Sequence, residues 1–169
     1  RFIGVVVPNT RKVAKEFSLA SWEVIEALLE SEWHECRLCA LIILVERYKK
    51  HPEETVRFYL ENTRGINNWD LVDLSAPYIL GRYLTQHEDR SVLYALAGSE
   101  NMWEQRIAVV STLALIRDNL FDDTIKLAEK FMGTKHDLMQ KATGWMLREV
   151  GKRDERTLTD FLDRHCLQM

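Results

Sequence analysis

The sequence predicts an all-α protein made of repeated helix pairs, and three observations support this prediction. Apolar residues recur at helical spacing through nearly all of the 169 residues. No segment alternates apolar and polar residues with a period of two, so no strand is expected. Long helical segments also alternate with short ones at a nearly constant interval, which indicates structural repeats.

The helix starts are marked by residues typical of first turns and caps. Pro8 and Pro52 suit first helical turns, and Ser21, Ser31 and one of the two asparagines at 67 and 68 are typical N-caps. Gly65 ends the helix before those asparagines. Together with the apolar spacing, these signals predict helices over 8–17, 21–30, 31–50, 52–62, 68–86, 91–97, 102–118, 122–132, 138–151 and 155–165.

The long helices align through one column of residues, which holds Arg37, Asp73, Arg106 and Lys141. The intervals between them are 36, 33 and 35 residues. Such a period, with two helices per unit, is typical of a HEAT-like α-solenoid, whose units bury their apolar faces only by stacking. We expect about five helix pairs in a single domain over 1–169, with a concave inner face lined by the second helices. Terminal helices are expected to be missing at both ends.

The composition excludes several classes of protein. Seven Gly and three Pro are too few for a disordered chain. The longest apolar run, from Leu38 to Val45, is too short to cross a membrane. Three Cys do not make a disulfide framework, so the reducing cytoplasm is the expected location.

We expect neither a metal nor a cofactor. Cys36 and Cys39 are spaced like zinc ligands and His34 is close to them, but a closed zinc site needs four ligands, and Cys166 is the only other Cys. Core packing explains the pair better. The sequence has no Gly-rich phosphate loop and no Gly-x-Ser-x-Gly nucleophile motif.

Charge is divided between the two kinds of helix. The net charge of −3 gives no general attraction for nucleic acid. The short helices at 21–30 and 52–62 are acidic, whereas the long helices hold most of the Lys and Arg residues. This pattern predicts a basic inner face, although ordinary solvated helix surfaces would produce it equally well. The residues of this face expected to contact a polyanion such as DNA are Arg37, Lys141, Arg148 and Lys152.

One position of the column differs from its neighbours, because Asp73 stands where the other repeats have a basic residue. Trp69 lies one turn before Asp73 on the same helix face, and Trp145 lies one turn after Lys141. Stacking would gather Trp69, Asp73, Arg106 and Trp145 in one cleft, although core packing or a helix-terminus charge would explain each residue alone. Two indole faces and a carboxylate attract a cation, and an arginine suits a phosphate. Alkylated DNA combines both, since N3- or N7-alkylation leaves a cationic purine on a phosphodiester backbone.

Four segments also carry a resemblance to a known family. They are Phe2-Ile3-Gly4-Val5 with Pro8-Asn9-Thr10-Arg11, Asn68-Trp69-Asp70-Leu71-Val72-Asp73, Trp103 with Arg106, and Gln140-Lys141-Ala142-Thr143-Gly144-Trp145-Met146-Leu147-Arg148-Glu149-Val150-Gly151-Lys152. These segments resemble the AlkD-like DNA alkylation repair glycosylases, and the resemblance covers nearly the whole chain.

The resemblance implies a cofactor-independent enzyme that hydrolyses the N-glycosidic bond of a 3-alkyl- or 7-alkylpurine in double-stranded DNA. Asp73 matches the catalytic carboxylate of the family. Trp69 and Trp145 match the aromatic residues that contact the deoxyribose of the lesion, and Arg106 matches an active-site arginine. Gln105 departs from the family, because many members have a second basic residue there.

The expected partner is therefore DNA that contains alkylated bases, with neither a membrane nor an obligate protein partner. Two other interpretations remain open. The chain could be a non-catalytic DNA-binding relative, or it could be a protein-interaction scaffold, which is a common use of such repeats. The paired Trp69 and Asp73 favour the enzyme, because neither alternative needs an aromatic residue and a carboxylate in a basic groove.

Overall fold

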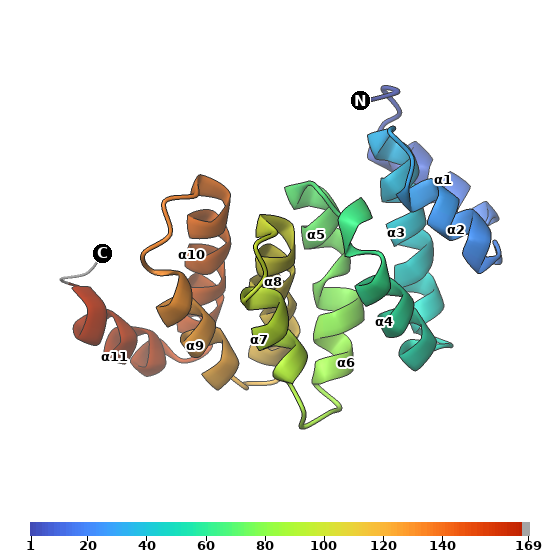
Figure 1. Ribbon diagram of the computed structural model, residues 1–169. Helices are drawn as coiled ribbons and strands as arrows, with labels where there is room; N and C mark the ends of the chain where they lie inside the picture. The colour runs from blue at the N-terminus through green and yellow to red at the C-terminus, as the bar shows by residue number, and fades with distance from the viewer. Residues whose placement is uncertain (167–169) are drawn as a thin grey trace.

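The structure, a computed structural model, describes residues 1–166 and contains helices but no strand within them. The helices stand side by side in a stacked array that runs from one end of the chain to the other (Figure 1). The all-α helical-repeat fold predicted from the sequence is confirmed. The predicted domain end at Met169 lies outside the described residues. In the part that is described, no helix combines the length and the apolar character needed to cross a membrane.

The helices agree closely with those expected from the sequence. Pro8 and Pro52 lie in first turns, and Asn68 caps its helix by accepting a hydrogen bond from the Trp69 N–H. Ser31 is not a cap, because the following helix begins only at His34. The elements are α1 Val7–Glu16, α2 Trp22–Leu29, α3 His34–Tyr48, α4 Pro52–Glu61, η1 Thr63–Gly65, α5 Trp69–Ser75, η2 Pro77–Gly81, α6 Arg82–Leu84, α7 Ser91–Ala97, α8 Met102–Arg117, α9 Asp122–Phe131, α10 Asp137–Gly151 and α11 Glu155–His165.

The pairs consist of a short helix followed by a long one. The complete pairs are α2 with α3, α4 with the continuous α5–η2–α6 segment, α7 with α8, and α9 with α10. Helix α1 packs on α3 at one end, and α11 packs on α10 at the other. The described chain therefore contains four complete pairs rather than five. The long helices contact one another in sequence order, so they form one layer of the array and the short helices form the other (Figure 1).

The long helices at the centre of the array are buried on nearly all sides. Every residue of α8 from Arg106 to Ile116 is buried, because α8 contacts α7, α9, α10 and the α5–η2–α6 segment. The apolar run of α3 is buried for the same reason between α1, α2, α4 and α5. A helix that is apolar all round belongs in such a position. Stacking therefore supplies the burial that an isolated pair lacks.

The long helix expected over 68–86 is interrupted in its middle. Pro77 has no N–H to donate, and the backbone there widens into a π-turn in which the Gly81 N–H donates to the Ala76 carbonyl at 2.8 Å. The extra residue in this turn rotates the following side chains around the helix. Tyr78, one turn after Leu74, lines the same cavity as Trp69 and Asp73, whereas Pro77 is buried.

The caps of the long helices define the register of the repeats. The N-cap residues of α3, α5, α8 and α10 follow one another at intervals of 35, 33 and 35 residues, at Trp33, Asn68, Asn101 and His136. Counted from these caps, Asp73, Arg106 and Lys141 occupy the same position. The corresponding residue of α3 is Leu38, which is buried in the core.

The predicted place of Arg37 in this column is therefore wrong by one residue. Arg37 has the position of Gln105 and Gln140. Each of these three side chains donates a hydrogen bond to a backbone carbonyl six residues earlier in the chain. They secure the turns before α3, α8 and α10. The interval of 36 residues between Arg37 and Asp73 is one longer than the cap spacing of 35, because Arg37 was aligned with Asp73 in place of Leu38.

Helix α8 and the π-turn approach each other closely at Gly81. A Cβ added to Gly81 would overlap the Ser111 carbonyl oxygen and would lie 3.1 Å from the Ala114 Cβ. The Ser111 oxygen belongs to a buried helix backbone and has little freedom to move aside. Gly81 is therefore needed for the contact between the two helices that carry Asp73 and Arg106.

We predict that Gly81→Ala lowers the free energy of unfolding by about 1–3 kcal/mol, the usual cost of overpacking. Urea unfolding followed by circular dichroism measures this change. Gly144→Ala is the matched control, because Gly144 also lies within a long helix but an added Cβ there meets nothing within 4 Å. Equal stability of the two variants would contradict the close approach.

Candidate active site

Asp73 and Arg106 form a two-point ion pair that joins α5 to α8. The Nε and Nη2 atoms of Arg106 donate to Asp73 Oδ1 at 3.1 and 2.9 Å, and Nη2 also lies 2.9 Å from Oδ2. The third nitrogen, Nη1, donates to the carbonyl oxygen of Leu138 in the first turn of α10. Arg106 thus connects three consecutive long helices. All three of its nitrogens have protein partners, whereas the sequence predicted a phosphate for this side chain.

The ion pair is largely withdrawn from solvent. Arg106 is 4% exposed, and the Asp73 side chain is 21% exposed. Burial raises the pKa of the Asp73 carboxyl above its ordinary value, while the hydrogen bond and the positive charge of Arg106 act in the opposite direction. Asp70 nearby raises the pKa of Asp73 further. A carboxylate that is only partly hydrated is well suited to attract a second cation.

Asp73 and Trp69 line a cavity of about 470 Å³ on the long-helix layer. Arg11 of α1, Glu46 of α3 and Tyr78 of η2 contribute to its walls. No residue of the short helices α2 and α4 lines the cavity, so it opens on the side of the long helices turned away from them. We call this side the inner face. The cavity has aromatic and carboxylate groups on its walls, which is the combination predicted for a cation.

The first turn of α5 is fixed by polar contacts that orient Trp69. Asn68 Oδ1 accepts a hydrogen bond from the Trp69 N–H at 2.7 Å. Asp70 Oδ1 accepts one from the Leu71 N–H at 2.9 Å, and Asp70 Oδ2 lies 2.7 Å from the Nε2 of the buried His34 on α3. These contacts hold the end of α5 against α3, while the Trp69 ring, at 52% exposed, remains accessible from the cavity.

Two of the predicted catalytic residues, Arg106 and Trp145, do not line this cavity. Arg106 is bonded to Asp73, whereas Trp145 lies farther along the array. It lies on α10 two turns after Leu138, whose carbonyl binds Arg106. Its ring is partly buried against the core. The structure therefore brings together Trp69, Asp73 and Arg106, with Trp145 on the next long helix.

Three of the residues predicted to contact DNA are exposed on α10 and at its C-cap. The Nζ of Lys141 donates to Asp137 at 2.7 Å, the Nζ of Lys152 donates to Glu149 at 2.8 Å, and Arg148 lies 3.7 Å from the same glutamate. These exposed pairs are weak and exchange readily with solvent or with another anion.

Arg37 does not belong to this group. Its side chain lies in a separate cavity bordered by Glu26 of α2 and Glu61 of α4. Contact between Arg37 and DNA stays a prediction, and the acidic neighbours weigh against it.

Comparison with known proteins gives a family for the chain. The family described as DNA alkylation repair enzyme matches residues 1–169. The chain belongs to this family.

A solved structure, the predicted DNA alkylation repair enzyme from Enterococcus faecalis, superposes with a TM-score of 0.75 at 24% sequence identity. The match covers 96% of this chain and 81% of that one, and it supports the fold. Among curated proteins, none matches the chain. The resemblance noted in the sequence is thus confirmed at the level of the family, and it implies a role in alkylation repair with DNA as the molecule acted on.

Several residues of this alkylation repair enzyme that line the cavity were not singled out from the sequence. Arg11 lies within a segment that resembles the family, but helical spacing alone gave it no role. Tyr78 was missed because the prediction from the sequence followed only Trp69 and Asp73 along the helix. Its spacing of four residues from Leu74, which lines the same cavity, is the signal that could have indicated it. Asp70 and His34 lie on different helices, and only the stacking brings them into contact.

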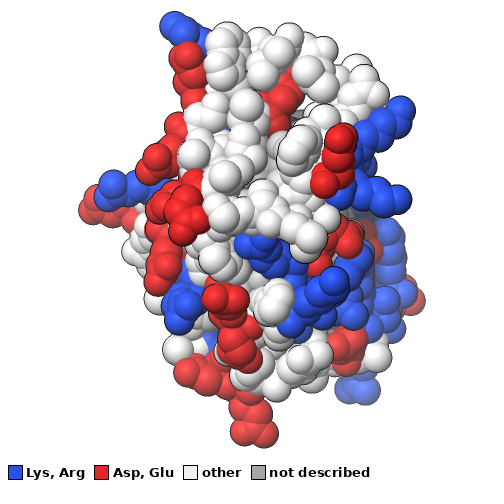
Figure 2. Space-filling model, turned by 90° about the vertical axis from the view of Figure 1, so that its right-hand side faces the viewer, with Lys and Arg blue, Asp and Glu red and all other residues white. Residues whose placement is uncertain are grey.

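The predicted division of charge is visible on the surface of the enzyme. In Figure 2 the Asp and Glu side chains gather along one edge of the molecule, and most Lys and Arg side chains cover the opposite side. Exposed glutamates are concentrated on α2 and α4, whereas exposed basic residues follow the ends of the long helices. The inner face is nevertheless not uniformly basic, since Glu46, Asp70 and Asp73 line the cavity.

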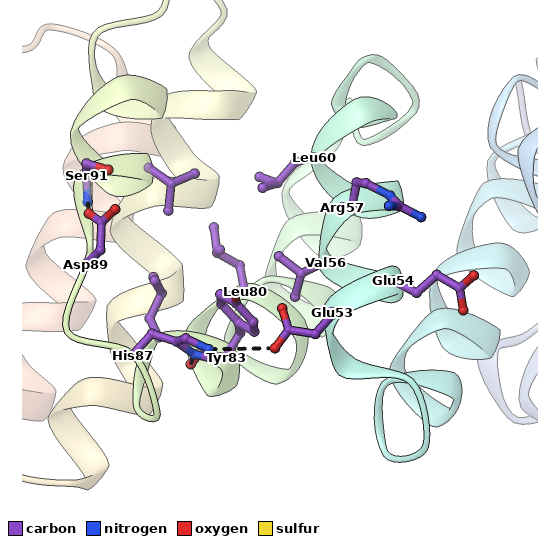
Figure 3. A pocket seen from close by; sticks show the side chains of 12 residues that line it. Glu53, Glu54, Val56, Arg57, Leu60, Leu80, Tyr83, His87, Asp89 and Ser91 are labelled. Atoms are coloured by element: carbon purple, nitrogen blue, oxygen red, sulfur yellow. Dashed lines mark hydrogen bonds and ion pairs between the residues drawn. The ribbon is translucent and has the colours of Figure 1, made fainter.

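A second cavity, of about 750 Å³, lies between α4 and the segment from α6 to α7 (Figure 3). Glu53 Oε1 lies 3.6 Å from His87 Nε2, and the rings of His87 and Tyr83 stack with centroids 3.8 Å apart. None of the predicted site residues lines it. Within residues 1–166, no group of three or more His, Cys, Asp or Glu side chains could hold a metal ion.

We predict that Arg106→Met raises the pKa of Asp73 further, because it removes the hydrogen bond and the charge that oppose the effect of burial. Titration of the side-chain carboxyl carbons by NMR measures the shift. Breaking a buried pair costs about 3–5 kcal/mol of stability, so Arg106→Lys, which keeps the charge but lacks the planar fork, serves as a second variant with a smaller rise. Arg148→Met is the control on an exposed arginine. An unchanged pKa in both Arg106 variants would show that the pair does not control Asp73.

Proposed function

We propose that the protein is a DNA glycosylase that removes cationic N3- or N7-alkylated purines from duplex DNA in base excision repair. The observation that carries the proposal is the partly buried Asp73 carboxylate, held by Arg106 beside the exposed ring of Trp69. A negative charge fixed next to an aromatic face suits a reaction whose transition state is a cation.

The alkylated base departs without help from an acid, because its positive charge already makes it a good leaving group. The bond between C1′ and the base nitrogen breaks, and its electron pair neutralises the base. The deoxyribose then carries the positive charge as an oxocarbenium ion. Asp73 stabilises this ion by its charge, and since Arg106 fixes the carboxylate beforehand, little reorganisation accompanies the reaction.

Hydrolysis is completed by water. A water molecule bound to the accessible edge of Asp73 attacks C1′ and loses a proton, which passes to the carboxylate or to solvent. The pKa of Asp73, raised by burial, makes the carboxylate a better proton acceptor than an ordinary aspartate. Trp69 contacts the sugar from one side, and Trp145 contributes a second aromatic surface from α10.

DNA lies against the inner face in this proposal. Lys141, Arg148 and Lys152 on α10 contact the phosphates, replacing their weak surface pairs with Asp137 and Glu149. Arg106 acts differently from the sequence-based expectation, because its nitrogens are occupied by Asp73 and Leu138. It is a positioning residue for the carboxylate rather than a phosphate ligand.

A non-catalytic DNA-binding relative is the main alternative. It would share the basic side chains of α10, but it would gain nothing from a buried carboxylate aimed at the cavity. Against phosphates such a carboxylate is repulsive. Because such a carboxylate weakens DNA binding, its presence at the cavity favours an enzyme that uses it over a protein that only binds DNA.

The decisive variant is Asp73→Asn, which keeps the shape of the side chain and removes its charge. We expect it to depress single-turnover release of 7-methylguanine from methylated duplex DNA strongly, about tenfold for each 1.4 kcal/mol by which transition-state stabilisation falls. Affinity for DNA should stay equal or increase, because a carboxylate facing phosphates opposes binding.

Trp69→Ala and Trp145→Ala should each reduce excision less, since each ring supplies part of the surroundings of the cation. Melting temperatures, measured in parallel, separate a loss of chemistry from a loss of folded protein. Full excision by Asp73→Asn would defeat the mechanism even if the enzyme still bound DNA.

Replacing a basic side chain of α10 is expected to affect DNA binding rather than the chemical step. Arg148→Ala should weaken binding to damaged and undamaged duplex alike and should lower the salt slope by about one unit for each phosphate that is no longer bound. Fluorescence anisotropy at several salt concentrations measures both quantities. Arg57→Ala, on the short helix α4, is the control and should leave the slope unchanged. An unchanged slope in Arg148→Ala would count against DNA contact through α10.

A further inference from the structure

Tyr78 and Arg117 are in contact beside the cavity, and Arg82 follows Tyr78 by four residues along the same segment. None of the three was predicted as a site residue, and the proposed reaction does not use them. The guanidinium carbon of Arg117, the last residue of α8, lies 5.8 Å from the centre of the Tyr78 ring. Arg82 begins α6, about one turn after Tyr78 along the same segment. Tyr78 is 41% exposed and lines the same cavity as Trp69 and Asp73. We call these three residues the Tyr78 cluster.

The two arginines of the cluster carry charge that the protein leaves free. Both are exposed, and within residues 1–166 neither forms an ion pair or a side-chain hydrogen bond. Lys49 and Lys152, at the corresponding ends of α3 and α10, differ in this respect, because their Nζ atoms donate to Glu46 and Glu149. An unpaired guanidinium over an aromatic ring is held in place by the ring while its donors stay available.

The position of the cluster relative to Asp73 is set by the helices. Nine residues separate Asp73 from Arg82, a rise of about 13 Å, and eleven separate Arg106 from Arg117, a rise of about 16 Å. The grooves of B-form DNA are about 12 Å and about 6 Å wide. When one strand lies at the level of Asp73 and the duplex runs across the long helices, the other strand therefore passes near the cluster.

We propose that the Tyr78 cluster binds backbone phosphates of the DNA strand opposite the lesion. The proposal rests on the proposed function, with the inner face as the DNA-binding surface. Arg82 and Arg117 supply fork-shaped donors that match phosphate oxygens, and the Tyr78 hydroxyl adds a further donor. Contact with both strands fixes the duplex across the layer, so that the sugar of the lesion faces Asp73. The cluster thus predicts tighter binding of duplex than of single-stranded DNA.

The test combines protein variants with neutral backbone linkages in a synthetic duplex. Methylphosphonates are placed either in one strand or in the other, and affinity is measured by anisotropy with a fluorescent duplex that carries one abasic site analogue to fix the register. Arg82→Gln and Arg117→Gln are expected to weaken duplex binding and to lower its salt slope by about one unit for each phosphate that they no longer bind. They should not change the affinity for the lesion strand when it is offered as a single strand. Arg57→Gln on α4 is the matched control.

Coupling between variant and linkage decides which strand is bound. Neutral linkages opposite the analogue should weaken the wild-type protein and have little further effect on the Arg82 and Arg117 variants, because both changes remove the same interaction. The proposal would be overturned if the losses from the arginine variants and from neutral linkages opposite the analogue were additive, while the variants coupled to linkages in the lesion strand. Equal losses for single-stranded and duplex DNA would overturn it as well.

The tyrosine has its own readout. Tyr78→Leu removes the ring that orients Arg117 and should reproduce part of the Arg117→Gln loss, whereas Tyr78→Phe keeps the ring and removes only the hydroxyl. A Tyr78→Leu variant that binds duplex normally would exclude the ring from the cluster. Excision is measured separately, so a protein that binds both strands but releases no base would contradict the proposed enzyme and leave this inference standing.

Discussion

The ion pair between Asp73 and Arg106 is the interaction on which the site depends. It brings two charges into a region that is mostly withdrawn from water, which is unfavourable unless both are paired with good geometry. Here the geometry is met by two-point contact, and the remaining nitrogen of Arg106 is satisfied by Leu138. The same guanidinium therefore fixes the proposed catalytic carboxylate and locks the relative positions of α5, α8 and α10. Any shift between these repeats would leave a buried charge without its partner.

The helices that carry this pair also approach each other closely farther along, at Gly81. Pro77 widens one turn of the α5–η2–α6 segment, and Gly81 lets the widened turn meet the backbone of α8 at Ser111. Tyr78 lies within this turn and lines the cavity beside Asp73, where its ring meets the arginine at the end of α8. The same short segment thus contributes both to the packing of two repeats and to the inner face.

The sequence predicted the helices and the repeat because caps, prolines and apolar spacing are local signals. It predicted that Trp69, Asp73 and Arg106 meet because a fixed interval places equivalent positions side by side. It assigned Arg37 to the wrong position, since an interval of 36 residues cannot be told from 35 without the caps. It also predicted that Arg106 binds a phosphate. Whether this arginine instead pairs with Asp73 of the preceding repeat depends on the distance between the two helices, which is not a local signal. Tyr78 was missed because its contact with Arg117 joins two repeats and depends on how the helices stack.

The distribution of charge on the inner face has a meaning for the proposed reaction. A strongly basic surface would hold any DNA tightly and would distinguish lesions poorly. Here several basic residues of α3 and α10 are balanced by Glu46, Asp137 and Glu149, and the cavity itself carries Asp70 and Asp73. Glu46 and the accessible edge of Asp73 attract a cationic base, whereas an uncharged base gains nothing from them. In the proposed reaction the cavity therefore favours the lesion by its charge, without a pocket that reads the shape of the base.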